Sequence, residues 1–145
     1  MSKISFNSIY DGVSLLLHKA YPTAQIHGGE VKQGLREGDF NVAIPFTAQT
    51  GELGTRARRE PTLLIRYYPS DKGGYAECAK TADELTVLLE SIITPEGDAV
   101  HGGAMRWEVV DGVMHFGITY RHFVFIADET PEAMETLEVV TETPI

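Results

Sequence analysis

The chain has 145 residues, 43% of them hydrophobic, which is the size and composition of one ordinary domain with a single core. Its formal net charge of -9 argues against general nucleic-acid binding, which needs clustered Lys and Arg, although a local basic patch is able to touch DNA. No apolar run reaches the roughly 18 to 20 residues of a membrane span, and the N-terminus lacks the pattern of a secretory signal. Cys78 is the only cysteine, so no intramolecular disulfide can form, as is typical of a chain that matures in a reducing cytoplasm.

The first predicted element is an amphipathic helix over residues 5–20. Ser5 is its expected N-cap, and Tyr21 ends it because the residue before Pro22 is pushed out of the helical region. Its apolar face consists of residues spaced by three, four and one, namely Phe6, Ile9, Val13, Leu16, Leu17 and Ala20.

Two strands are predicted next. Residues 24–33 indicate a short strand with a break at Gly28 and Gly29. Residues 39–46 alternate, with Phe40, Val42, Ile44 and Phe46 expected on one side. Pro45 indicates an edge position or a strand end, because it has no N–H to donate to a neighbouring strand.

Residues 47–60 are polar and are predicted to form a long connection that carries Arg56, Arg58 and Arg59. If the next strand starts early, alternation puts Arg56 and Arg58 on one side. Two interpretations stay open: a solvated strand start with ion pairs to Glu52 or Glu60, or a protruding basic edge that docks an acidic partner surface or faces DNA. Arginine suits either use, because it binds carboxylate or phosphate with two parallel hydrogen bonds.

Residues 61–68 predict the returning strand, and residues 74–92 a second helix that ends at Thr94-Pro95. Cys78 lies on the apolar face of that helix, which favours a buried core thiol over a reactive one. The expected face comprises Tyr75, Cys78, Ala79, Ala82, Leu85, Leu89 and Ile92. Residues 96–103, with three glycines, are expected to be a loop.

The best-patterned segment is MRWEVVDGVMHFGITYRHFVF, residues 105–125. Asp111-Gly112 between apolar runs predicts a hairpin with a type I′ turn, and residues 113–126 its long central arm. One face of this arm should carry the apolar residues Met114, Phe116, Ile118, Tyr120, Val124 and Ile126. The other face should carry His115, Thr119 and Arg121.

No pattern in the chain predicts chemistry. His115 and His122 are seven residues apart, so a regular strand sends them to opposite faces and they cannot share a metal. There is no G-x-S-x-G elbow, and residues 51–55 lack the Lys and the spacing of a phosphate loop. The sequence therefore predicts no catalytic residue, no metal site and no cofactor.

Together the elements predict an α+β fold, a mainly antiparallel sheet with two helices packed on it, in a single domain over residues 1–126. Residues 127–145 form an acidic extension with six Asp and Glu residues and no Lys or Arg. Within it, residues 132–140 are expected to form either a further helical turn or a strand. The pattern of residues 136–140 favours the strand.

The motifs in order along residues 5–126 resemble the small tail terminator family of long-tailed phages, prophages and phage-tail-like particles of Gram-positive bacteria. After the N-terminal helix, the matching pieces are EVKQG at 30–34, FNV at 40–42, LGTR at 53–56 with Arg58 and Arg59, IRYYP at 65–69, and MRWEVVDGVMHF at 105–116 with Tyr120 and Phe123. The acidic end is not part of the resemblance.

The resemblance implies a structural protein of the virion tail, assembled in the host cytoplasm, without catalytic residues or cofactors. Such proteins are subunits that close into a ring, usually a homohexamer. The ring caps the tail tube, stops tube polymerisation and offers a surface to the neck or head-completion protein. DNA would only pass through its channel, and no membrane is involved. The resemblance brings no motif of contact residues; the basic cluster and the loop before it indicate an interface at Leu53, Arg56, Arg58 and Arg59.

Two other classes stay open. One is another neck, tail-completion or head-closure protein of the virion. The other, less favoured, is a small enzyme or ligand-binding domain, which should bring titratable residues together in a pocket.

Overall fold

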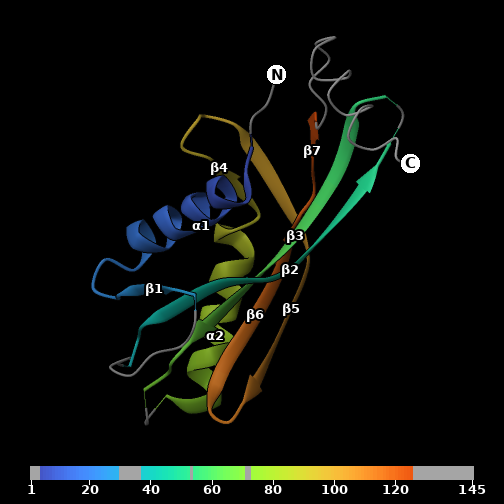
Figure 1. The fold of residues 1–145 in the computed structure, drawn as a ribbon. Coiled ribbons are helices and arrows are strands. Elements are labelled where there is room, and N and C mark those ends of the chain that lie inside the picture. The colour runs from blue at the N-terminus through green and yellow to red at the C-terminus, as the bar shows by residue number, and fades with distance from the viewer. Residues whose placement is uncertain (1–3, 30–36, 53, 71–72, 126–145) are drawn as a thin grey trace.

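Figure 1 shows the computed structural model, which describes residues 4–29, 37–52, 54–70 and 73–125. The elements in chain order are α1 (Phe6–Ala20), β1 (Ile26–Gly28), β2 (Phe40–Gly51), β3 (Arg56–Tyr67), α2 (Gly74–Leu88), β4 (Ser91–Ile93), β5 (Ala99–Val110), β6 (Val113–Tyr120) and β7 (His122–Phe125). They form one sheet in the order β1-β2-β3-β6-β5-β4, and β7 pairs with β3. Within the described chain only the β1–β2 pairing is parallel. The predicted α+β fold is therefore confirmed.

Helix α1 begins and ends where the sequence predicts. The Ser5 hydroxyl accepts the Ser8 N–H at 3.0 Å, and the Ser8 hydroxyl accepts the Ser5 N–H at 3.3 Å, so each side chain caps the other's backbone. At the far end the Tyr21 N–H donates to Leu17. A Cβ at Gly12 would lie 3.1 Å from the Ile93 carbonyl oxygen, so glycine lets α1 lie close against β4.

Helix α2 ends at Leu88 rather than at residue 92, and the chain turns into the short strand β4, which the sequence did not predict. Leu89 and Ile92 are fully buried as expected. Their three-residue spacing suits a helix, but it is equally compatible with a turn followed by a buried strand residue. The backbone hydrogen bonds of Ile92 go to β5, and this tertiary pairing decides the boundary.

The predicted connection over residues 47–60 is wrong. Strand β2 continues to Gly51 and β3 already begins at Arg56, so most of the polar stretch is a long hairpin. Its side chains are polar on both faces, so no apolar alternation marks it, and main-chain pairing alone makes it a sheet. A β-bulge between Ala43 and Phe46 also reverses the alternation, which leaves Phe46 64% exposed instead of on the core side.

Strand β5 begins at Ala99, so the loop predicted over 96–103 is limited to its first residues. The hairpin at Asp111 and Gly112 is confirmed, with φ of 52° and 78°, both positive as a type I′ turn requires. Strand β6 lies between β3 and β5, as expected for the central strand predicted over residues 113–126. Its residues Met114, Phe116, Ile118 and Tyr120 are fully buried. Ile126, at the end of the predicted arm, lies outside the described residues.

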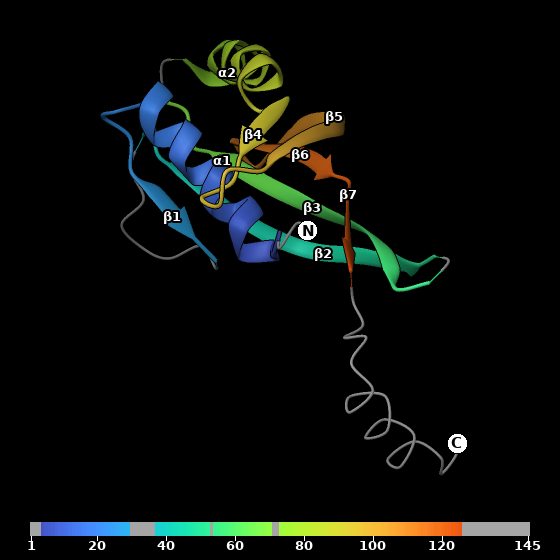
Figure 2. The same ribbon diagram turned by 90° about the horizontal axis from the view of Figure 1, so that it is seen from above.

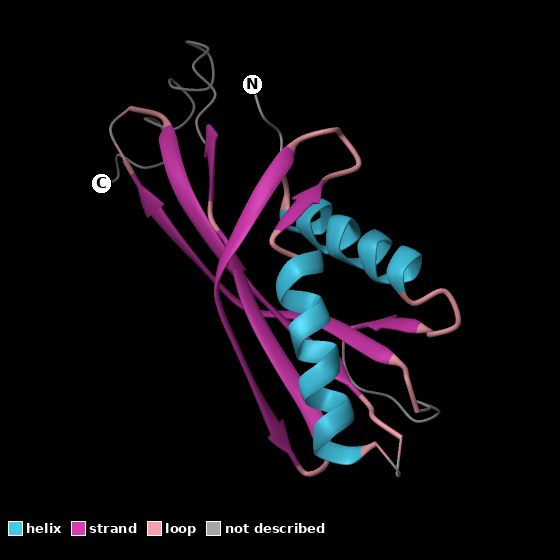
Figure 3. Cartoon of the chain, turned by 180° about the vertical axis from the view of Figure 1, so that it is seen from behind, coloured by secondary structure: helices cyan, strands magenta, loops and turns pink. Residues whose placement is uncertain are grey.

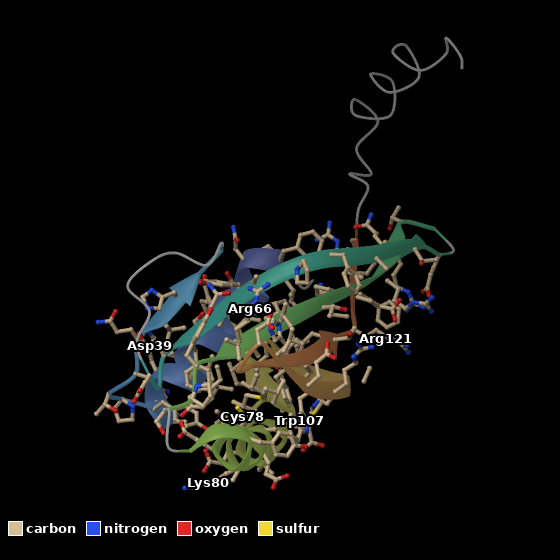
Figure 4. The ribbon with its side chains drawn as sticks, turned by 90° about the horizontal axis from the view of Figure 1, so that it is seen from below. Asp39, Arg66, Cys78, Lys80, Trp107 and Arg121 are labelled. Carbon is tan, nitrogen blue, oxygen red and sulfur yellow. The ribbon has the colours of Figure 1, made fainter. Side chains whose placement is uncertain are left out.

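Both helices lie on the same side of the sheet, as Figures 2 and 3 show from two directions. Side chains from both helices and from the central strands form one core. Burial of each large apolar side chain there contributes roughly 1.5–3 kcal/mol. Cys78 is fully buried, which confirms the core thiol, and Figure 4 shows it between α2 and the sheet while Lys80 points away from the molecule.

Neither of the two described helices has the length and apolar character that crossing a membrane requires. The acidic extension at 127–145, with the turn or strand predicted inside it, lies outside the described residues.

Candidate interaction surface

The distal arm is the part of the sheet that reaches beyond the helices in Figure 2; it consists of residues 46–51 of β2, 56–61 of β3 and 122–125, which form β7. The Glu52 N–H donates to the Arg56 carbonyl at 2.8 Å and closes the tip of the hairpin. Strand β7 extends the β6 register along β3, because Thr62 pairs with Thr119 and Arg59 with His122. The arm is thus a three-stranded ribbon.

Arg56 and Arg58 point to the same side of the arm, as the early strand start predicts. This side belongs to the open face, which is the sheet face opposite the helices. The Arg56 Nη2 lies 2.9 Å from Glu52 Oε1, and the Arg58 Nη1 lies 3.6 Å from Glu52 Oε2. The Arg58 Nε is 3.6 Å from Glu60 Oε1, which is an ion-pair distance but too long for a hydrogen bond.

Arg121, which lies between β6 and β7, belongs to the same network and donates to Glu60 at 3.0 Å. Figure 4 labels it beside the arm. Each of these exposed ion pairs contributes only about 0–1 kcal/mol to stability, because water screens the charges. The predicted ion pairs of Arg58 with Glu52 and Glu60 are therefore present. Their small contribution to stability does not explain why the arginines are clustered.

Arg59 lies on the opposite face of the arm, because successive side chains of a strand point to opposite faces and Arg59 directly follows Arg58. Its Nε donates to the Gln49 Oε1 at 2.6 Å, and its guanidinium carbon lies 4.5 Å from the centre of the Phe6 ring. The structure therefore brings Arg56 and Arg58 together and separates Arg59, which ties the arm to the start of α1. Leu53, the fourth predicted residue, lies outside the described residues.

Three aromatic side chains on the open face were not predicted from the sequence as interface residues. Phe46, Phe123 and Phe125 are 64%, 43% and 55% exposed. The Arg56 guanidinium lies over the Phe123 ring at 4.5 Å, which keeps a cation and an aromatic surface side by side. Phe123 and Phe125 share the parity of Thr119, so the alternation of the long arm already indicated that they point away from the core.

His122 lies on the covered face of the arm and is 6% exposed. Burial lowers the pKa of its ring, with a further contribution from the Arg59 charge, against the opposing effect of the Tyr120 carbonyl that its Nδ1 approaches at 3.2 Å. Its Nε2 has no hydrogen-bond partner within the described chain. The ring is therefore neutral near pH 7 and belongs to the packing of the arm.

His115 lies on the open face, in a hollow between the arm and the β5–β6 hairpin. Burial lowers its pKa too, followed by the effect of Arg66 and opposed by Glu108 and Asp111. The two histidines thus lie on opposite faces, as parity predicts. Among the described residues, no three His, Cys, Asp or Glu side chains come together as a metal site.

An α+β subunit with a projecting arm of cations and exposed aromatic rings is suited to protein contacts, since Arg and aromatic residues are enriched in interfaces. A family model described as phage tail terminator protein matches residues 8–132. The match covers most of the chain, so the protein belongs to this family of phage tail terminators. No curated protein matches the sequence.

Membership makes the protein a structural component of the virion tail that acts in tail completion and meets tail tube and neck proteins. This confirms the resemblance to tail terminators. It also favours that class over the small enzyme or ligand-binding domain, because the family is structural rather than enzymatic.

Proposed function

We propose that this protein closes into a homohexameric ring that caps the tail tube, ends tube polymerisation and presents its other face to the neck. The observation that carries the proposal is the distal arm, which projects past the helices with two arginines and three exposed aromatic rings on one face. DNA meets such a ring only while passing through its channel, in keeping with the net charge of -9.

Strand edges offer a route to ring closure. Beyond Val42, β2 pairs with β3 on one side and with no other described strand, and among the described strands β7 pairs only with β3. Unpaired N–H and C=O groups on such edges can bind a strand of another subunit. A contact between different patches of neighbouring subunits forms a closed ring when the rotation per subunit divides the circle.

The arginine side chains supply the specificity of the proposed contact. The side chains of Arg56 and Arg58 are 52% and 35% exposed, so they can reach a carboxylate surface on a neighbour or on the tube. Arg59 supports them by holding the arm against α1. Leu53, which follows Glu52 in the sequence, is proposed as the fourth contact residue. These four residues form the proposed interface.

The test is the double variant Arg56→Glu with Arg58→Glu. The fold should persist because the ion pairs it removes are exposed, whereas ring closure or tube capping should weaken. Light scattering and native mass spectrometry measure the assembly, and negative-stain images of tail tubes measure their length. A second pair, Arg56→Gln with Arg58→Gln, removes the charges without adding repulsion to Glu52 and Glu60.

The matched control is Lys19→Glu with Lys80→Glu, which makes the same charge change at two exposed positions on the helices. It should leave assembly and tube length as in the wild type. Normal ring formation and normal tube length in both arginine variants would refute the assigned role of the arm. A wild-type protein that stays monomeric with and without tubes would refute the ring itself.

A further inference from the structure

We infer that the acidic C-terminal segment, residues 127–145, of one subunit binds the open face of the distal arm of the neighbouring subunit. The inference rests on the proposed ring, since only an assembly places a second arm within reach. It names the acidic partner of the arginines as a piece of the same chain.

The arm and the C-terminal segment have opposite charges. On its open face the arm and its base carry three arginines, Arg56, Arg58 and Arg121, against two glutamates, Glu52 and Glu60. The internal ion pairs therefore leave this face with an excess of positive charge. The C-terminal segment has six Asp and Glu residues and no Lys or Arg, in a protein that is acidic as a whole. A cationic ribbon in an acidic protein is the surface that attracts such a segment.

The open face of the arm also has exposed apolar surface. Phe46, Phe123 and Phe125 are exposed on the same face as Arg56 and Arg58. The acidic segment is not a purely charged run, because its sequence METLEVV, residues 134–140, interleaves glutamates with Met, Leu and Val. Such a segment can pair its carboxylates with the arginines while its apolar side chains cover the rings.

The position where the described chain ends favours a neighbour over the same subunit. Strand β7 runs antiparallel to β3, and its last residue, Phe125, pairs with Arg56, the first residue of β3. The described chain thus ends near the tip of the arm, with β7 directed away from the body. Binding to its own arm would require an immediate reversal. Going onward, 19 residues reach on the order of 60 Å when extended, which is enough to cross to an adjacent subunit.

Cross-linking tests the contact directly in the full chain. One subunit carries Thr50→Cys, an exposed position paired with Arg58 on the open face, and a differently tagged, co-expressed subunit carries Thr136→Cys. The native Cys78 is buried and does not interfere. A short bifunctional thiol reagent should join the two tagged chains covalently. The control pairs Thr136→Cys with Lys80→Cys on α2 and should give no product.

A charge exchange provides the second test. The arm variant Arg56→Glu with Arg58→Glu, and the segment variant Glu135→Lys with Glu138→Lys, should each weaken subunit association by at least about tenfold. A mixture of the two variants should assemble again, because each reversed segment then meets a reversed arm and each native segment a native arm. Native mass spectrometry of the mixture should show rings that contain both chains.

The outcomes separate this inference from the proposed function. Rings that form normally with the reversed segment, and without cross-links between subunits, would overturn the inference and leave the ring standing. A third sample has both Thr50→Cys and Thr136→Cys in one chain, and a link that forms only within that chain and never between two subunits would also overturn the inference. A wild-type chain that forms no assembly, alone or on tubes, would overturn both.

Discussion

Replacing Tyr120 by Phe removes one oxygen atom from the centre of the core and leaves the shape of the side chain unchanged. The Tyr120 hydroxyl donates to the Leu89 carbonyl at 2.6 Å, and both residues are fully buried. Leu89 is the C-cap of α2, where the last carbonyls have no partner inside the helix. Burial raises the pKa of Tyr120, so the hydroxyl stays protonated and donates at neutral pH.

The variant leaves a buried carbonyl without its donor, which costs about 1–3 kcal/mol of the free energy of unfolding. In a chain of this length, each kcal/mol lowers the melting temperature by about 2–4 °C. The assay is chemical and thermal unfolding of the full chain, followed by far-UV circular dichroism. The protein concentration is held fixed because subunit association adds to the apparent stability.

Tyr75→Phe is the matched control. Tyr75 is 67% exposed, so its hydroxyl remains open to water and its loss should change the stability by less than about 0.5 kcal/mol. If Tyr120→Phe is as stable as this control, the hydrogen bond does not hold the end of α2 to β6, and the account of this boundary is wrong.

Three further variants test local features of the fold. Ser5→Ala removes the reciprocal cap with Ser8 and should cost about 0.5–2 kcal/mol of unfolding free energy, measured by urea titration. Gly112→Ala places a side chain at a φ of 78° in the hairpin turn and should cost about 1–2 kcal/mol in the same assay. His122→Gln should flatten the fall in stability at acid pH, measured as melting temperature between about pH 5 and 7.5.

The sign of the pH effect follows from the lowered pKa of His122. The unfolded chain binds a proton near pH 6.5 while the folded chain resists it, so stability is full above that value and falls as the pH drops. His115 has the same direction of shift and leaves a residual slope in the variant. An unchanged slope in His122→Gln would contradict this account, as would unfolding free energies of Ser5→Ala and Gly112→Ala that match the wild type.

The amino-acid pattern was sufficient wherever one face of an element meets the core and the other meets water. That condition holds for α1 and for β6, whose helical and alternating patterns predicted their limits and buried residues. The turn at Asp111 and Gly112 was predictable because few sequences tolerate two consecutive positive φ values. Alternation also predicted that Arg56 and Arg58 lie on one side if the strand after the glycine-containing stretch begins before residue 61.

The pattern was insufficient where main-chain pairing acts without an apolar signature. Residues 47–60 are mostly polar on both faces, so only the register of β2 with β3 reveals a hairpin in place of a loop. The bulge before Phe46 and the switch from α2 to β4 depend on hydrogen bonds to strands distant in the sequence. The exposed aromatic rings became part of the candidate surface only because β7 lies beside Arg56 and Arg58.

By itself, the sequence determined the fold class, the buried face of β6 in the hairpin at residues 105–125 and the resemblance to tail terminators. It could do so because hydrophobic periodicity and turn chemistry are local properties. Tertiary structure alone decided that the strand already begins at Arg56, which rings accompany Arg56 and Arg58, and that the described chain ends beside the start of β3. Those properties depend on pairing between strands that are up to about 70 residues apart, and no local pattern encodes that pairing.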